Sequence, residues 1–440
     1  MKVLILGGNP AGMSAASRIK RKAPDTEVVV LEKSWEVSYG ACGLPYYVAG
    51  LNEDLDKIRI RRVSEFEKMG LCIHLGCEAL EIDHEKKCVR AVEGEQEKEF
   101  SYDRLIIATG ASPKKPPFPG IELGGIFCLK TLQDAERIKE KLVQCRGNVV
   151  IVGGGYIGLE IAEACILQKA KSIRIIEAMD RVLNTFDKEF GHAVQAELEK
   201  HGASVQTGER VQRFKGIDGQ VTEIITDRGC YEADMIILSI GVTPNTGFVK
   251  GLKKLSNGAI ITDAAMRTSI KDIFAVGNCA TVQHRLTKNP VYIALGTNAN
   301  KQGRLAGDSV LGKAVCFDRA LGTSMLRCMG LELAKTGFSE EEAHREGLSY
   351  KVKTVEARSH ARYYPDPCII TIKLVYREED HVILGAQVMG EKEAAWRIDI
   401  FACAIDRGMT TEEVGYLDLG YAPMFAGVWD AVQIAANAAK

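Results

Sequence analysis

The sequence predicts an α/β fold with two parallel βαβ motifs and a final α+β segment, and three features lead to this prediction. Two short apolar runs, at 2–6 and 148–152, fit strands that are buried on both faces. Each run enters a glycine-rich turn, then a helical pattern, then a second apolar run. Apolar runs at 103–110 and 234–245 echo each other, so we expect an internal duplication.

Length and composition limit the number of domains and the kinds of partner that this chain can have. The 440 residues are enough for two or three domains with full cores. The net charge of -1 gives no reason to expect a polyanionic partner, so we expect no nucleic-acid ligand. The N-terminal apolar run is short and has no cleavage-site pattern, and it is far from the length of a membrane span. We therefore expect a cytoplasmic protein with no membrane partner.

The N-terminal βαβ motif has an imperfect dinucleotide-binding pattern. Gly7 and Gly12 fit the first and third glycines of G-x-G-x-x-G, but Asn9 occupies the central position. The second apolar run, 27–33, contains Glu32 near its end, where an acid hydrogen-bonds a ribose. On its own this match is weak.

The second βαβ motif has the complete pattern. Gly153, Gly155 and Gly158 occupy all three glycine positions, and Glu177 follows at the end of the next strand. An acid there repels a 2′-phosphate, which favours NADH, although nearby Arg181 keeps NADPH possible. Two dinucleotide-binding motifs imply two dinucleotides, and we expect one to be FAD and the other a nicotinamide. The fold therefore contains two Rossmann-like domains.

The stretch 38–47, SYGACGLPYY, places one cysteine just before a predicted helix. Pro45 fits the first turn of that helix, and Cys42 lies at or just before its N-terminus. A helix N-terminus stabilises a thiolate, so we interpret Cys42 as a redox thiol. The alternative is a small buried cysteine, because cysteine is among the most buried residue types.

The other cysteines give no sign of a metal site. The chain has 13 cysteines and no C-x-x-C pair. Cys72 and Cys77 are the nearest pair, in an alternating strand-like segment, and two further ligands at suitable spacing are missing. We expect most of the 13 to be reduced core residues and no metal.

Over essentially its whole length the chain resembles the flavin-dependent pyridine nucleotide–disulfide oxidoreductases. The stretch Ser38–Tyr47 is similar to the S-x-x-x-C-G-L-P-Y-Y pattern of their single-cysteine branch. That branch contains coenzyme A-disulfide reductases, NADH:polysulfide or persulfide reductases, NADH oxidases and NADH peroxidases. The resemblance implies FAD, NADH or NADPH, and Cys42 as the single redox cysteine.

The resemblance also implies which residues bind the cofactors. Tyr156 is similar to the aromatic residue that covers the flavin ring, and Glu160 to a residue beside the nicotinamide. Asn278 stands where relatives have an Asp that bonds the flavin ribityl chain, and an amide can still bond there. The expected cofactor-binding residues are Gly7, Asn9, Pro10, Ala11, Gly12, Glu32, Lys33, Ser38, Thr109, Gly110, Gly153, Gly155, Tyr156, Ile157, Gly158, Glu160, Glu177, Gly241, Gly277 and Asn278.

Two features distinguish members of this branch. Oxidases and peroxidases carry a His at the position of Pro10, and proline has no proton to give, which disfavours those activities. The stretches 360–365 (HARYYP) and 418–423 (DLGYAP) resemble those of coenzyme A-disulfide reductases, in which tyrosines reach the partner subunit's cysteine. The resemblance therefore implies a homodimer in which Tyr421 and either Tyr363 or Tyr364 complete the site. Alternatively, these tyrosines are only interface aromatics.

Coenzyme A phosphates need cations. Arg18 and Lys22 are i,i+4 neighbours on the first predicted helix, and Arg59 and Arg61 alternate onto one face of a strand-like run. Such clusters are also common on solvated surfaces. The expected substrate residues are Arg18, Arg21, Lys22, Tyr39, Arg59, Arg61 and Arg62.

These observations predict an FAD domain at 1–111 and 243–319, an NAD(P)H domain at 112–242 and a dimerisation domain at 320–440. We expect the protein to use NAD(P)H to reduce a coenzyme A disulfide, a persulfide or a related small disulfide or polysulfide through Cys42. Two alternatives remain. One is an NADH oxidase that reduces oxygen through a Cys42 sulfenic acid, and the other is a flavin reductase for a small redox protein.

Overall fold

A computed structural model describes residues 1–440. The chain forms two compact units. Unit 1 contains Met1–Leu44, Glu53–Pro113 and Val242–Ala320, and unit 2 contains Pro45–Asn52, Lys114–Gly241 and Leu321–Lys440. The division predicted from the sequence, with boundaries after residues 111, 242 and 319, stays a prediction.

Unit 1 is built on a parallel sheet in which β1 lies between β2 and β7. Its apolar strands pair along their whole length, as expected for strands covered on both faces. In spatial order the strands are β18 (Ile273–Ala275), β7 (Arg104–Ile107), β1 (Lys2–Leu6), β2 (Glu27–Glu32) and β3 (Cys72–Leu75).

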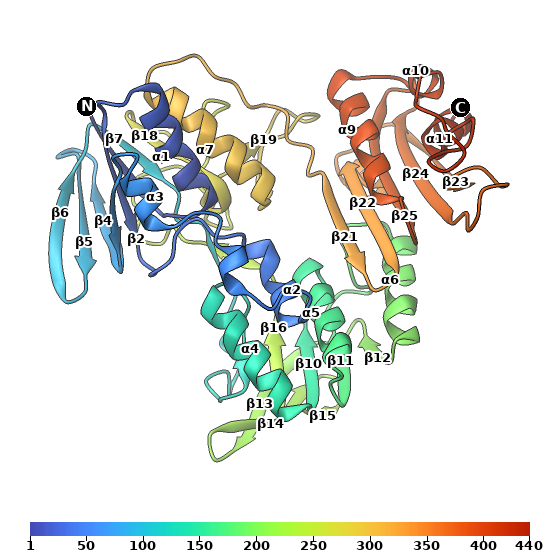
Figure 1. Ribbon diagram of the computed structural model, residues 1–440, viewed down its shortest axis with the longest axis horizontal. Coiled ribbons are helices and arrows are strands. Elements are labelled where there is room, and N and C mark those ends of the chain that lie inside the picture. Colours follow the sequence, from blue (N-terminus) through green and yellow to red (C-terminus); the bar gives the residue numbers. More distant parts are fainter. The chain divides into compact units, whose positions relative to one another are not determined.

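Alternate residues of β1 face two different layers. Val3 and Ile5 pack against the helices α1 (Pro10–Lys22) and α7 (Gly296–Val310), which lie side by side in Figure 1. Leu4 and Leu6 pack against an antiparallel sheet of three strands, β4 (Cys77–Asp83), β5 (Cys88–Glu93) and β6 (Gln96–Ser101). The parallel sheet is therefore covered on both faces.

The other elements of unit 1 are short. They are η1 (Ala41–Gly43), η2 (Leu55–Ile58), α3 (Val63–Glu67), β8 (Ala111–Pro113), β17 (Val242–Pro244), η3 (Gly277–Cys279), β19 (Val282–Gln283) and β20 (Pro290–Val291). The helix α2 (Leu44–Val48) continues the chain from unit 1 into unit 2.

The first part of unit 2 repeats this architecture. Its parallel strands, in spatial order, are β12 (Ala203–Gln206), β11 (Ser172–Ile176), β10 (Asn148–Val152), β16 (Met235–Leu238) and β9 (Ile126–Phe127). A second antiparallel sheet contains β13 (Val211–Ile217), β14 (Gln220–Thr226) and β15 (Cys230–Glu232). The helices are α4 (Leu132–Cys145), α5 (Tyr156–Leu167) and α6 (Lys188–Lys200).

The last part of unit 2 has one antiparallel sheet, in the order β21 (Ser324–Cys328), β22 (Leu331–Gly337), β25 (Ile383–Gly390), β24 (Ile369–Arg377) and β23 (Tyr350–Arg358). The helix α9 (Ile398–Arg407) packs on β22 and β25, and α11 (Ala431–Ala438) packs on β23 and β24. The shorter helices are α8 (Glu340–Arg345), η4 (Ala395–Arg397) and α10 (Thr411–Gly415).

The mixed α/β fold confirms the predicted fold class. Among all the helices, none combines the length and the apolar sequence that a membrane crossing requires. One local prediction is wrong: Arg59 and Arg61 do not lie on a strand. The only ladder contact of this segment is an isolated bridge between Arg59 and Tyr39.

Candidate active site

Cys42 lies in a short turn that runs directly into a helix. It is the middle residue of η1, and α2 follows at Leu44 with Pro45 as its second residue. This confirms the local structure predicted around Pro45. The cysteine is exposed, so the alternative of a buried core cysteine is wrong.

Backbone hydrogen bonds hold the loop that carries Cys42. The Ser38 N–H donates to the Gly8 carbonyl at 2.9 Å, and the Ile60 N–H donates to the Ser38 carbonyl at 2.8 Å. Ser38 has a φ of 51°, in the left-handed region, so the backbone is not extended at this residue. The cysteine loop is thereby tied to the glycine turn that follows β1.

The turn after β1 has the geometry of a dinucleotide cradle. Gly7 has a φ of 112°, and a Cβ there would lie 2.3 Å from the Ala108 carbonyl oxygen. A Cβ on Gly12 would lie 1.9 Å from the Gly7 carbonyl oxygen, so α1 starts very close to the strand. No side chain caps the N-terminus of α1, which begins at Pro10. Its first N–H groups therefore suit a pyrophosphate.

Glu32 is positioned by the same turn. Its carboxylate accepts hydrogen bonds from the Gly8 N–H at 2.7 Å and from the Ser34 N–H at 2.8 Å. The side chain is buried at the end of β2. A carboxylate has further lone pairs for a ribose hydroxyl, so this position fits the predicted role.

Other predicted flavin residues lie at the same sheet edge. Ala11 and Gly12 follow β1, Lys33 follows β2, and residues 109–110 and 277–278 follow β7 and β18. Carboxyl ends of parallel strands meet at one edge, where α/β sheets bind ligands. The Asn278 carbonyl accepts a hydrogen bond from the Tyr292 hydroxyl at 3.1 Å. This edge of the sheet therefore combines the uncapped N–H groups of α1, closely packed glycines and a buried acid. These groups fit the phosphates and the ribose of FAD.

The turn after β10 has almost the same geometry. Gly153 has a φ of 104°, and a Cβ on Gly158 would lie 2.0 Å from the Gly153 carbonyl oxygen. A Cβ on Gly155 would have no atom within 4 Å, and no side chain caps α5. The space beside Gly155 therefore suits a second pyrophosphate. Ile157 is exposed on the first turn of α5, and Gly241 follows β16 at a φ of 96°.

The acid of the second motif matches that of the first. Glu177 accepts hydrogen bonds from the Gly154 N–H at 2.7 Å and from the Met179 N–H at 2.8 Å. By contrast, Arg181 is buried and ion-paired, with Glu341 at 2.6 Å and Asp180 at 3.0 Å. The guanidinium that kept NADPH possible in the sequence analysis is therefore bound by two carboxylates.

Two side chains at the start of α5 have raised pKa values. Burial raises the pKa of Tyr156, whose hydroxyl is 2.7 Å from the Ser324 hydroxyl. Burial and then the charge of Glu163 raise the pKa of Glu160 to about 7. Glu160 can therefore hold or release a proton near neutral pH.

Three of the predicted substrate cations line one cavity in unit 1. The cavity has a volume of about 350 Å³ and is lined by Glu36, Val37, Asp56, Arg59, Arg61, Arg62 and Val63. Arg59 is ion-paired with Glu36 at 2.6 Å and with Asp56 at 2.8 Å. Arg62 is paired with Asp56, whereas Arg61 has no ion pair.

The other predicted substrate residues do not line this cavity. Arg18 forms an ion pair with Asp308 of α7 at 2.7 Å, and the Arg21 side chain donates to the Ser17 carbonyl. Lys22 is exposed at the end of α1, and Tyr39 is buried. The predicted cations therefore form two groups, one that lines the cavity and one that lies on α1.

The C-terminal tyrosines behave differently from one another. The hydroxyls of Tyr363 and Tyr421 are 2.7 Å apart, and both side chains are exposed. This hydrogen bond raises the pKa of Tyr421. Tyr364 instead packs edge-on against His360, with ring centroids 5.3 Å apart. Tyr363 is therefore the partner of Tyr421.

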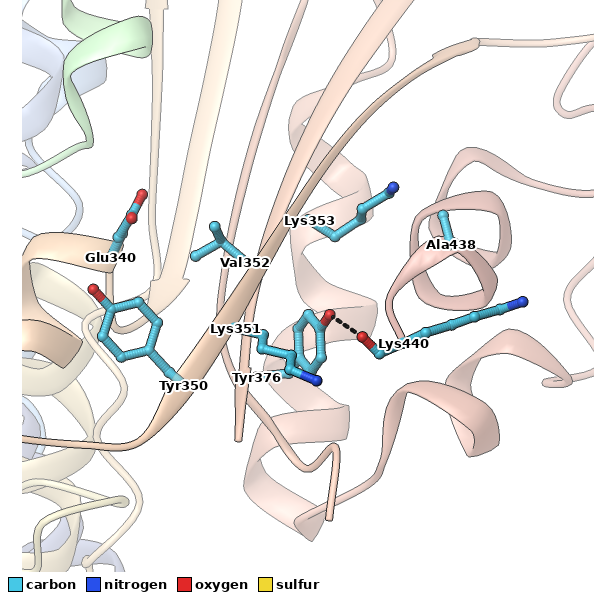
Figure 2. Close-up of a pocket in the computed structure, with 8 residues that line it drawn as sticks. All are labelled: Glu340, Tyr350, Lys351, Val352, Lys353, Tyr376, Ala438 and Lys440. Atoms are coloured by element: carbon cyan, nitrogen blue, oxygen red, sulfur yellow. Dashed lines mark hydrogen bonds between the residues drawn. The ribbon is translucent and has the colours of Figure 1, made fainter. Parts of the chain in front are cut away.

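A larger open cavity, of about 670 Å³, lies on the C-terminal sheet (Figure 2). In Figure 2, Glu340 and Tyr350 lie near one another, and the Tyr376 hydroxyl donates to the Lys440 carbonyl. The full lining is Glu340, Tyr350, Lys351, Val352, Lys353, Tyr376, Ala438 and Lys440. It contains none of the predicted site residues, and no sequence pattern indicated it.

The cysteines differ from expectation. Only four of the 13 are buried, namely Cys77, Cys165, Cys279 and Cys328. The expectation that most are core residues is therefore wrong. No group of three or more His, Cys, Asp or Glu side chains is arranged to hold a metal ion.

Sequence reasoning also missed the partners of the predicted residues. Asn245 bonds Thr109 from a distant segment, with its amide nitrogen 2.9 Å from the Thr109 carbonyl. Gln302 of α7 accepts a hydrogen bond from the Gly277 N–H at 2.9 Å. These contacts join segments far apart in the chain, so no local spacing predicts them.

Comparison with known proteins now identifies the family. Residues 1–303 match the pyridine nucleotide-disulphide oxidoreductase family, and residues 326–432 match its dimerisation domain. The chain belongs to this family and is an oxidoreductase, and membership implies FAD and NAD(P)H as cofactors.

Some relatives that match the whole chain are named as coenzyme A persulfide reductases, and others are named as NADH oxidases. An NAD(P)H coenzyme A polysulfide/persulfide reductase of Pyrococcus horikoshii is 38% identical, over 100% of this chain and 98% of the relative. An NADH oxidase of Enterococcus faecalis is 32% identical, over 100% of this chain and 99% of the relative. The solved NAD-dependent persulfide reductase of A. fulgidus is 36% identical with a TM-score of 0.96, covering 99% of this chain and 82% of that chain.

Proposed function

We propose that this enzyme uses NADH to reduce a coenzyme A-linked disulfide or persulfide at Cys42. The observation that carries the proposal is the exposed Cys42 thiol in a turn tied to the N-terminal dinucleotide motif. The relatives that are 38% and 36% identical are named as persulfide reductases, which supports the same chemistry.

The reaction at sulfur is thiol–disulfide exchange. The Cys42 thiolate attacks one sulfur of the substrate and forms a new S–S bond, and the other half leaves as a thiolate or hydrosulfide. FAD, when bound beside this loop, would supply the electron pair that comes from NADH. Two-electron reduction of the new S–S bond would free the Cys42 thiolate and release the second thiol. A hydroxyl close to the departing sulfur stabilises its negative charge.

The tyrosine pair is proposed to supply that hydroxyl in a homodimer. Tyr363 and Tyr421 share a hydrogen bond while remaining exposed, so either hydroxyl can turn to another acceptor. The segment around them exposes further large apolar side chains, which favours burial against a second copy. They are Met424, Phe425, Val428 and Trp429. We propose that these tyrosines act on the partner subunit's Cys42, and that Tyr364 has a packing role.

The dinucleotide sites are proposed as the two cradles described above. The motif with Gly7 and Glu32 binds FAD, and the motif with Gly155 and Glu177 binds the nicotinamide nucleotide. NADH is favoured because Glu177 repels a 2′-phosphate and Arg181 is bound by Glu341.

Substrate phosphates are proposed to bind the arginine cavity. Arg61 and Arg62 are its most available cations, because Arg59 is paired with both Glu36 and Asp56. Arg18, Arg21 and Lys22 on α1 remain candidates for a second phosphate. Guanidinium groups suit phosphate because they bond it in a bidentate manner.

The direct test is anaerobic turnover. The enzyme with NADH is mixed with coenzyme A disulfide and, separately, with coenzyme A persulfide, and NADH loss is followed while mass spectrometry identifies the group on Cys42. We expect turnover and a coenzyme A adduct on Cys42. In a second measurement, Arg61→Ala is compared with a control, Arg345→Ala, which changes an exposed arginine outside the arginine cavity. Only Arg61→Ala should raise the KM for the coenzyme A substrate.

Other outcomes would favour the rivals. NADH consumption only after air is admitted would support an NADH oxidase, the name of the relative from Enterococcus faecalis. Electron transfer to a small redox protein that is unaffected by Cys42→Ser would support a flavin reductase. Either result would overturn the proposed reaction.

A further inference from the structure

A second thiol of unit 1 is part of a nucleophile–base–acid arrangement that the proposed reaction does not use. Cys72 and His74 lie on β3, an edge strand of the parallel sheet. They are two residues apart, so their side chains share one face of the strand. Glu93 ends β5 in the neighbouring antiparallel sheet.

The three side chains form a continuous hydrogen-bonded chain. The Cys72 Sγ is 3.5 Å from His74 Nε2, and His74 Nδ1 is 2.9 Å from Glu93 Oε1. An ionised carboxylate only accepts hydrogen bonds, so Nδ1 donates to Glu93, and in the neutral ring Nε2 then presents its lone pair to the thiol. His74 is therefore oriented as a base for Cys72.

Two further contacts support the arrangement, one on the imidazole and one on Glu93. Phe100 packs edge-on against the ring, with centroids 5.0 Å apart. Lys98 pairs with the second carboxylate oxygen of Glu93. The hydrogen bonds from Lys98 and His74 lower the pKa of Glu93, which keeps the carboxylate ionised beside the ring.

Exposure together with an adjacent imidazole distinguishes Cys72 from the thiols of Cys77, Cys230 and Cys145. Cys72 is exposed, whereas Cys77 is buried with its pKa raised to about 11 by burial. Exposed Cys230 lies against Glu223, and burial together with this carboxylate raises its pKa. Exposed Cys145, at the end of α4, has a thiol that forms no hydrogen bond and offers an internal reference.

A metal site does not explain the arrangement. Cys72 and Glu93 contact opposite nitrogens of the same ring, so the three groups do not surround one point. No metal-binding group of His, Cys, Asp and Glu is present in the structure.

We propose that Cys72 is a second reactive thiol, which undergoes exchange with low-molecular-weight disulfides independently of Cys42. The Cys72 thiol gives its proton to His74 Nε2, and the thiolate attacks one sulfur of the disulfide RSSR. The Cys72–SR bond forms, the RS–SR bond breaks, and the leaving RS⁻ takes the proton from His74. No reductant or further oxidant is needed, so the site does not depend on the proposed function.

The test uses the full chain carrying Cys42→Ser, with bound FAD. The probes are iodoacetamide and glutathione disulfide, and peptide mass spectrometry gives the rate at each cysteine. The Cys72 thiol has a base, His74, at hydrogen-bond distance, whereas the Cys145 thiol has none. Because a thiol reacts faster when a base takes its proton, we expect Cys72 to react about tenfold faster than Cys145. Glutathione disulfide should place one glutathione on Cys72.

Variants separate activation from mere exposure. His74→Gln should reduce the Cys72 alkylation rate to that of Cys145, and exposed His84→Gln should leave it unchanged. If His74→Gln does not retain FAD, Glu93→Gln gives the same comparison, because it removes only the charge behind the ring. Equal rates at Cys72 and Cys145 in the parent chain, unchanged alkylation in the variants, or no glutathione on Cys72 would overturn the proposal.

Discussion

The two βαβ motifs have nearly the same backbone but present different side chains. Gly7 and Gly153 have φ values of 112° and 104°, and each lies against the carbonyl of a neighbouring strand's end. Glu32 and Glu177 each accept a backbone N–H at 2.7 Å. Four strands also have the same order, because β7-β1-β2-β3 corresponds to β16-β10-β11-β12, while the outermost strands β18 and β9 come from different places in the chain. The shared backbone therefore accounts for dinucleotide binding as such.

The differences begin within the helices. Counted from the third glycine, α1 has Ser14 and Ser17 where α5 has Glu160 and Glu163, and Asn9 stands in place of Gly155. Burial raises the pKa of both α5 glutamates. The duplicated backbone therefore sets the class of ligand, while a few side chains on α1 and α5 set the chemistry beside it.

The largest expected effect comes from the first glycines. Gly7→Ala and Gly153→Ala each place a Cβ within 2.6 Å of a carbonyl oxygen at a positive φ. We expect each to reduce the free energy of unfolding by about 3 kcal/mol, from backbone strain and overpacking. Gly7→Ala should lose FAD, whereas Gly153→Ala should keep FAD but resist reduction by NADH. Urea unfolding and flavin absorbance measure both effects.

The matched control is Gly247→Ala, because a Cβ there would have no neighbour within 4 Å and needs no positive φ. It should leave stability and both cofactors unchanged. Loss of FAD from Gly153→Ala alone would contradict the assignment of one dinucleotide to each motif.

The second effect concerns Glu160. Its pKa is about 7 in the folded protein and 4.5 ordinarily, so the folded state binds more protons between these values. Stability therefore falls as pH rises through this window. Glu160→Gln should remove the fall and increase stability at pH 8 by about 2 kcal/mol. Urea unfolding at pH 5 and pH 8 measures this change in the free energy of unfolding, and Glu199→Gln at an exposed position is the control. An equal pH dependence of stability in the parent and in Glu160→Gln would contradict the prediction.

A smaller effect is expected for the acids. Glu177→Gln would weaken the charged hydrogen bond that Glu177 is proposed to make with the nicotinamide nucleotide, so the KM for NADH should rise about tenfold with bound FAD unchanged. Glu32→Gln should do the reverse, loosening FAD while leaving the KM for NADH unchanged. Steady-state kinetics with a flavin count distinguishes the two, and identical changes in both variants would break the comparison.

The smallest effect is expected for Asn9→Gly, which makes the first motif resemble the second. The Asn9 side chain accepts a hydrogen bond from the Tyr39 N–H at a long 3.5 Å. Removing so long a bond costs less than about 1 kcal/mol, so the dissociation constant of FAD should change less than about fivefold. Fluorescence titration of the apoprotein with FAD measures it, and complete loss of binding would show that Asn9 is essential.

Local sequence signals predicted the local features well. The glycine spacing located both turns, because positions such as Gly7 and Gly153 need a conformation that other residues rarely adopt. Pro45 located the helix after Cys42 because proline fits a first helical turn. Glu32 and Glu177 could be predicted because each lies at the end of a short apolar strand.

Long-range features could not be predicted in this way. Arg181 is bound by Glu341, 160 residues away, and no local spacing in the sequence indicates this ion pair. The antiparallel pairing of β4 with β5 and β6 was not predicted, because a strand such as β6, QEKEFS, lacks a clear apolar alternation. Cysteine burial was overestimated because residue type alone does not reveal an edge strand, where Cys72 lies.

The central claim is that electrons reach the substrate through Cys42. The most direct measurement compares the parent enzyme with Cys42→Ser by anaerobic stopped-flow, with NADH and coenzyme A disulfide. We expect flavin bleaching by NADH to be equally fast in both proteins. Turnover of the disulfide should fall by about 1,000-fold or more in Cys42→Ser, because a covalent nucleophile is lost. Undiminished disulfide turnover by Cys42→Ser would contradict the central claim.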